Sequence, residues 1–182
     1  MTDKAVLISI NPHPTSQIIS GEKKAEIRKT KPNLPTPFPC YIYESSGNRF
    51  VGNQNHSGIV RGTGRKKVIG EFVCDRIDYW QYHWMPDVMH IEKMSELSCV
   101  STTELLDYLG GIYDKQGNSK RLYAWHISDL VIYDEPKELS EFFLACNKPK
   151  GTDCSVCYER RENRCKSLKR PPQSWCYVEV MK

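Results

Sequence analysis

Six charged side chains lie in the nine residues Gly21-Glu22-Lys23-Lys24-Ala25-Glu26-Ile27-Arg28-Lys29, where a helical segment passes into a strand-like one. Residues 14–21 have the composition of a two-turn helix that Gly21 ends in the left-handed conformation. Residues 25–29 alternate in polarity and predict a short strand. The stretch is therefore a helix-to-strand corner that carries clustered charge.

The predicted strand places Glu26 and Arg28 two residues apart on one face, with Lys23 at its entrance. Such a group can hold a phosphate or polarise a carbonyl while the carboxylate moves a proton. The alternative is a surface ion pair worth less than about 1 kcal/mol. Lys23, Glu26 and Arg28 are accordingly the candidate catalytic residues if the protein is an enzyme.

Outward from this corner, the chain predicts more strands than helices. Strands are expected at residues 4–10, 40–44, 68–80, 122–133 (bent near Ser128-Asp129) and 174–181. Helices are expected at 102–109, behind a Ser101…Glu104 capping signature, and at 136–145, started by Pro136. Residues 45–67, with five glycines, predict a long surface loop. Because strands and helices do not alternate regularly, we expect an α+β fold, a small mixed barrel with short rim helices.

Positive charge is concentrated in three windows of a chain whose net charge is only +4. Residues 22–31 carry +3, residues 61–67 carry +4 and residues 148–170 carry +5. Clustered positive charge favours an anionic partner, most often phosphate, although three solvated loops would show the same pattern. The cations of interest are Lys29, Arg65 and Lys66, beside Lys23 and Arg28.

Aromatic residues are also frequent along the predicted strands. Tyr43 and Trp125 lie in two of them, and residues 79–84 contain four more rings. Rings near cationic side chains are typical of sites where nucleobases stack, although packing in the core is equally common. We therefore include Tyr43 and Trp125 among the candidate nucleic-acid-binding residues.

Four of the eight cysteines fall within twenty residues, at Cys146, Cys154, Cys157 and Cys165. A central C-x-x-C pair flanked by seven-residue loops suits a tetrahedral structural zinc ion, and nearby Lys and Arg favour thiolates. An iron–sulfur cluster and an unligated flexible loop are the alternatives. Cys176 could replace one ligand, but its strand pattern favours packing in the core.

Length and composition limit the remaining classes. The 182 residues are 39% hydrophobic, enough for a real core, and apolar stretches are too short to span a membrane. The N-terminus lacks the features of a signal peptide. We expect a cytoplasmic protein without a membrane partner.

The helix-to-strand corner, preceded by Ile8-Ser9-Ile10-Asn11-Pro12, resembles the G-x-K-x-x-E-x-R signature of ASCH (activating signal cointegrator homology) domains, which belong to the PUA-like β-barrel group. The similarity continues in Tyr41-Ile42-Tyr43-Glu44-Ser45, Val68-Ile69-Gly70-Glu71-Phe72 and Tyr123-Ala124-Trp125-His126-Ile127. Residues 170–179 look like the tail of phage- and bacterium-encoded members. The resemblance covers residues 1–145 and 171–182, and leaves 146–170 as a cysteine-rich basic insertion.

The resemblance implies a PUA-like barrel with a cleft lined by Lys23, Glu26 and Arg28, and RNA or a nucleotide as the ligand. Some ASCH members resemble amidohydrolases that act on acylated cytidines, and others have been described as ribonucleases. Glu26 stands where the amidohydrolase-type members have Thr. An RNA-binding module is therefore the first hypothesis, and a hydrolase of a modified nucleoside or a ribonuclease in the same cleft is the alternative.

Overall fold

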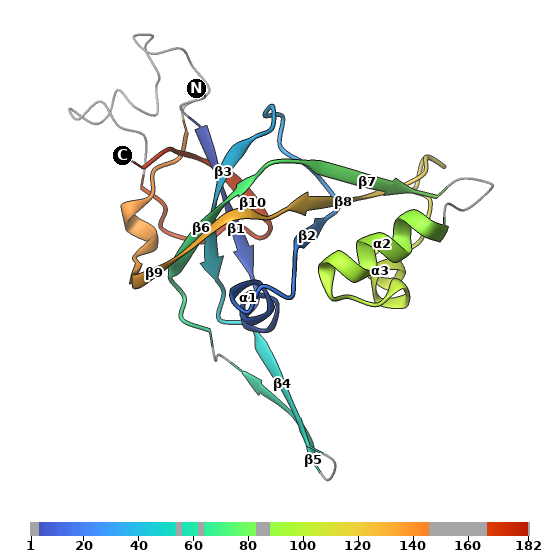
Figure 1. The fold of residues 1–182 in the computed structure, drawn as a ribbon, viewed down its shortest axis with the longest axis horizontal. Helices are drawn as coiled ribbons and strands as arrows, with labels where there is room; N and C mark the ends of the chain where they lie inside the picture. Colours follow the sequence, from blue (N-terminus) through green and yellow to red (C-terminus); the bar gives the residue numbers. More distant parts are fainter. Residues whose placement is uncertain (1–3, 54–55, 62–63, 83–87, 146–166, 182) are drawn as a thin grey trace. The chain divides into compact units, whose positions relative to one another are not determined.

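A computed structural model describes residues 4–53, 56–61, 64–82, 88–145 and 167–181 (Figure 1). The chain forms two compact units. The first comprises Met1–Thr15, Phe38–Phe72 and Leu130–Lys182, and the second comprises Ser16–Pro37 and Val73–Asp129. The helix α1 (Pro12–Ile19) contains the first passage from one unit to the other.

The first unit is built on a five-stranded sheet of order β10-β1-β3-β6-β9. Its strands are β1 (Lys4–Ile10), β3 (Phe38–Glu44), β6 (Val68–Cys74), β9 (Ser128–Lys137) and β10 (Trp175–Glu179). β1 pairs with β3 in parallel and with β10 antiparallel, so it is a central strand, and its near-continuous apolar run is buried. The core of this unit consists of Ala5, Leu7, Tyr41, Tyr43, Val68, Phe142, Leu168 and Val178.

The predicted loop at residues 45–67 is wrong, because part of it is a hairpin. β4 (Asn48–Asn53) pairs antiparallel with β5 (His56–Arg61), from Asn48↔Arg61 to Asn53↔His56. The β-forming residues of this segment are interleaved with glycines, so composition favours a loop while the two stretches satisfy each other's backbone groups.

The second unit pairs a three-stranded sheet with two helices. The sheet has the order β2-β8-β7, from β2 (Ala25–Arg28), β8 (Arg121–His126) and β7 (Ile77–Gln81). Helix α2 (Val88–Ser98) packs against β2 and against α3 (Thr102–Leu109), as Figure 1 shows. The core between sheet and helices consists of Ala25, Ile27, Trp80, Ile91, Met94, Leu105, Leu109, Leu122 and Ala124.

Helix α3 confirms the capping prediction at both ends. The Ser101 side chain accepts from the backbone of Glu104, and the Glu104 side chain accepts from the Ser101 backbone. Gly110 ends the helix with φ 70°. Both signals are local in sequence, which is why the boundaries could be predicted.

The prediction of an α+β fold is confirmed, but the predicted small mixed barrel is wrong for the described residues, whose strands form separate sheets that do not close. The two long predicted strands are each divided, 68–80 into β6 and β7 and 122–133 into β8 and β9. The first divides at Asp75-Arg76 and the second at Ile127, just before the expected bend, where Asp129 has φ 46°. Because the backbone leaves the ladder at these points, the described strands are divided between separate sheets.

The predicted helix at residues 136–145 is also wrong. β9 continues to Lys137, and only a 3-10 turn, η1 (Leu139–Glu141), follows. β9 ends the sheet order, so Pro136 costs the ladder little, since proline is tolerated at a sheet edge. Phe142 is buried, as the apolar pattern predicts.

Candidate functional site

Lys23 is brought inward by the corner that follows α1. Gly21 has φ 76°, and the backbone N–H of Lys23 donates to the Gln17 carbonyl at 3.0 Å. The Lys23 side chain is 3% exposed, and its Nζ donates to the Ser98 carbonyl at 2.7 Å. Ser98 is the last residue of α2, where the helix dipole is negative. Lys23 therefore caps α2 as well as contributing charge.

Glu26 lies between two cations, as the two-residue spacing predicts for Arg28. Glu26 Oε1 is 2.8 Å from Arg28 NH1, and Glu26 Oε2 is 3.3 Å from Lys23 Nζ. The Glu26 and Arg28 side chains are 7% and 13% exposed, so the group is buried rather than a surface pair. Removing one member of a buried ion pair is far more costly than breaking a surface one.

The second oxygen of Glu26 accepts no hydrogen bond from any described residue, although it is buried and close to Lys23. Buried carboxylate oxygens are normally hydrogen-bonded. The group as a whole has two positive charges and one negative. The Lys23 and Arg28 cations can therefore attract an anion, and the second oxygen of Glu26 is an acceptor that the described residues leave without a hydrogen bond.

Among the other predicted residues of the second unit, Lys29 is exposed and Trp125 is not. Lys29 Nζ lies 4.7 Å from the centre of the Tyr108 ring. Trp125 is fully buried, so a base has no access to its ring. Trp125 stands opposite Glu26 in the β2–β8 register, so its buried ring lies next to Glu26 on the same face of the sheet.

The remaining predicted residues belong to the first unit. Tyr43 is buried in its core, where burial and the Glu138 charge raise the pKa of the phenol. Arg65 and Lys66 have exposed side chains, and Lys66 has φ 57°. The Arg65 backbone N–H donates to Glu44 Oε1 at 2.8 Å. The side chains of Arg65 and Lys66 are thus accessible to an anion, whereas that of Tyr43 is not.

Glu44 is a buried acid that sequence reasoning did not single out. It is 6% exposed, and Thr15 Oγ1 donates to its Oε2 at 2.7 Å. Together with the bond from Arg65, this connects the end of β3 to α1 and to the segment before β6. The signal in the sequence was an acidic residue closing an apolar strand, which by itself has many explanations.

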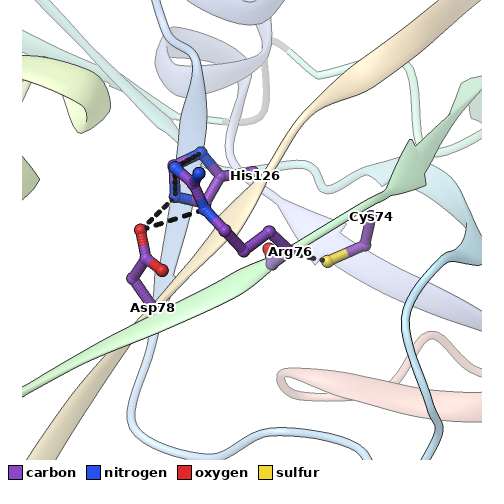
Figure 2. Close-up of polar contacts among 4 residues, drawn as sticks. All are labelled: Cys74, Arg76, Asp78 and His126. Carbon is purple, nitrogen blue, oxygen red and sulfur yellow. Dashed lines mark hydrogen bonds and ion pairs between the residues drawn. The ribbon is translucent and has the colours of Figure 1, made fainter.

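A second polar cluster lies where β7 begins and β8 ends (Figure 2). His126 Nε2 is 2.8 Å from Asp78 Oδ2, and Arg76 Nε is 3.3 Å from the same oxygen. Arg76 NH2 lies 3.4 Å from His126 Nδ1 and 3.2 Å from Nε2. Next to Arg76, burial, with a smaller contribution from Asp75, raises the pKa of Cys74 to about 12, so this thiol is not a nucleophile at neutral pH. The cluster holds the ends of two strands together.

The predicted metal ligands, Cys146, Cys154, Cys157 and Cys165, lie outside the described residues. Within the described ranges, no three His, Cys, Asp or Glu side chains are grouped to hold a metal ion. Cys176 packs against the core of the first unit, as expected, and burial raises its pKa to about 11. No helix in the described part of the chain is long and apolar enough to cross a membrane.

No family model matches the sequence, and no curated protein matches it. Among solved structures, an ASCH protein from Zymomonas mobilis is similar, with a TM-score of 0.58 and 18% identity over 100% of this chain and 90% of that chain. A tyrosine-to-phenylalanine variant of that protein gives 0.53 and 17% over 98% and 91%, and a serine-to-alanine variant gives 0.54 and 18% over 99% and 90%. The chain has the ASCH fold. The resemblance drawn from residues 21–29 is thereby confirmed at the level of fold.

Proposed function

We propose that this ASCH-fold protein binds RNA or a nucleotide at Lys23, Glu26 and Arg28. Arg28 and Lys23 attract the phosphate, and Glu26 accepts a hydrogen bond from a base amino group or a ribose hydroxyl. Lys29, and in the first unit Arg65 and Lys66, add exposed positive charge that favours a polyanion. Tyr43 and Trp125 are buried and do not contribute a contact to the ligand.

The observation that carries the proposal is that one buried oxygen of Glu26 lacks a hydrogen bond from any residue that the structure describes. Glu26 Oε2 lies 3.3 Å from the Lys23 ammonium but accepts no hydrogen bond from the described residues, whereas most buried carboxylate oxygens accept one. A nucleotide presents an anion and hydrogen-bond donors within one small molecule, which matches the two cations and the available acceptor. An inorganic anion would use the cations alone.

The test is binding of single-stranded RNA at two salt concentrations. We expect binding at low salt that weakens as salt rises, because phosphate contacts release counterions. Arg28→Gln and Glu26→Gln are the informative variants, and Glu22→Gln, an exposed acid nearby, is the matched control. Circular dichroism of each variant separates lost binding from lost folding. Absence of binding at low salt, or affinity independent of salt, overturns the proposal.

A hydrolase in the same site is the second candidate, and the same oxygen of Glu26 favours it. Glu26 would act as general base, Lys23 would orient the nucleophile and Arg28 would stabilise developing negative charge. Incubation with acylated cytidine and with RNA tests this. Turnover that is lost in Glu26→Gln supports a catalytic site, whereas binding without turnover favours an RNA-binding module.

We also propose that Cys146, Cys154, Cys157 and Cys165 bind one structural zinc ion. Four thiolates are a complete tetrahedral set, and few apolar side chains lie between residues 147 and 169, so metal binding would supply the energy that orders the segment. Elemental analysis of protein purified without chelator tests the proposal. One zinc per chain, lost in Cys157→Ser and kept in Cys176→Ser, is the expected result. Iron in its place indicates a cluster, and no metal overturns the proposal.

A further inference from the structure

A row of three side chains crosses the sheet of the second unit beside the charged site. In the strand registers, Arg28 of β2 stands opposite Tyr123 of β8, and Tyr123 stands opposite Tyr79 of β7. Residues directly opposite each other in antiparallel strands point to the same face. Adjacent strands are about 4.8 Å apart, so Tyr123 is the neighbour of Arg28 on this face and Tyr79 is the neighbour of Tyr123.

The outer end of this row is exposed and carries a second cation. Tyr79 is 58% exposed, and its ring centre lies 6.5 Å from that of Tyr123, with the planes inclined at 46°. The Arg121 guanidinium is 5.3 Å from the Tyr79 ring centre. Arg121 Nε donates to Gln81 Oε1 at 2.7 Å, which holds the guanidinium in place. The row therefore combines accessible aromatic surface with a positioned cation.

An exposed tyrosine on an edge strand is common and by itself indicates little. Tyr79 differs because its ring is in line with Arg28 and has its own arginine. Tyr113, in contrast, is 51% exposed but packs its ring edge-on to Tyr82 and has no such row. Tyr113 is thus a matched control for exposure.

We infer that Tyr79 and Tyr123 form a platform on which an unpaired base stacks when its phosphate is held at Arg28. The inference rests on the proposed function and makes it more specific: the ligand is single-stranded RNA, because the faces of bases in a duplex are already stacked. Stacking of a base on an aromatic side chain contributes roughly tenfold to a hundredfold in affinity and depends little on base identity. Arg121 adds a cation beside the ring.

Three probes of equal length test the inference: an oligouridine, the same backbone without bases, and an RNA duplex. The wild-type protein should bind oligouridine at least tenfold more tightly than the other two at matched salt. Tyr79→Ala should remove that preference, Tyr79→Phe should retain it, and Tyr113→Ala should leave it unchanged. Binding to the abasic backbone should be the same in all four proteins.

The outcomes distinguish the platform from the charged site. If Tyr79→Ala binds oligouridine as the wild type does, or if it weakens abasic and oligouridine binding equally, the platform is overturned. If salt-dependent binding that requires Arg28 persists in that case, the proposed function stands. No binding of any probe at low salt overturns both.

Discussion

Two buried glutamates, one in each unit, are held in different ways. Glu44, at the end of β3, is 6% exposed, and neutral donors, the Thr15 hydroxyl and the Arg65 backbone, bind its two oxygens. Glu26, in β2, is 5% exposed and lies between Lys23 and Arg28. One oxygen of Glu26 accepts no hydrogen bond from the described residues.

The difference separates a structural acid from a site. Each oxygen of Glu44 accepts a hydrogen bond from its own unit, so Glu44 connects segments of the fold. Glu26 is surrounded by charge yet retains capacity to accept a hydrogen bond. Burial alone therefore does not identify a functional carboxylate, and the partners of each oxygen do.

The largest effect on stability should come from removing the acid of the charged site. Glu26→Ala leaves Lys23 and Arg28 buried together without their shared counter-charge, and we expect a loss of about 3–5 kcal/mol in the free energy of unfolding. Urea unfolding followed by tryptophan fluorescence measures it. Glu22→Ala, at an exposed position, should change stability by less than about 0.5 kcal/mol. A loss below about 1 kcal/mol in Glu26→Ala would mean that the group is solvated and not buried.

The second effect contrasts the two acids directly. Glu44→Gln keeps one acceptor oxygen but turns an amide N–H₂ toward a donor, so we expect a loss of about 1–3 kcal/mol in stability. Binding of single-stranded RNA, measured on the folded variant, should be unchanged. Glu26→Gln should weaken that binding at equal protein concentration and salt. If the two variants weaken binding equally, the distinction between the two acids is wrong.

Much of this contrast could be predicted from sequence, but only where the signal is local. The period of two along β2 places Glu26 and Arg28 on one face, and the apolar run of residues 4–10 predicts β1 with its observed bounds. The acceptor of Lys23 is the Ser98 carbonyl, 75 residues away, and no local pattern indicates it. The same limit explains the hairpin β4–β5, whose strands stabilise each other through pairing.

The aromatic residues show the limit most clearly. Trp125 and Tyr123 are two residues apart on one face of β8, yet Trp125 is fully buried and Tyr123 is partly exposed. Alternation predicts the face of a strand but not how far along that face the covering structure extends. The sequence pattern therefore does not predict that Tyr43 and Trp125 are buried and that Tyr79 is exposed.

A third effect is the loss of stability at alkaline pH. Burial, aided by Glu71, raises the pKa of Tyr133 above the ordinary 10.0, and burial alone raises that of Cys176 from 9.0 to about 11. Tyr133 and Cys176 belong to the first unit, whereas Cys74, whose pKa burial raises to about 12, belongs to the second. Since the unfolded chain loses these protons first, stability is fully present below pH 9 and falls as pH rises through the range from 9 to 11.

Urea unfolding at pH 8 and pH 10.5 tests this effect. The wild type should lose stability at the higher pH, and Tyr133→Phe should lose less because one raised pKa has been removed. Tyr79→Phe, which removes an exposed phenol, should behave as the wild type. An equal loss in all three proteins would mean that the buried phenol contributes nothing to the alkaline response.

The smallest effect is expected at the cluster of Arg76, Asp78 and His126, which lies on the same sheet as Glu26 (Figure 2). The Arg76 and Asp78 side chains are 64% and 51% exposed, so water and salt screen their attraction. A double-mutant cycle of Arg76→Gln and Asp78→Asn should give a coupling below about 1 kcal/mol that decreases further in 0.5 M salt. The corresponding cycle of Arg28→Gln and Glu26→Gln should give a larger coupling that salt changes little, because that pair is buried. Equal couplings would show that the charged site has no more protection from solvent than an ordinary surface pair, and the contrast on which its functional assignment depends would fail.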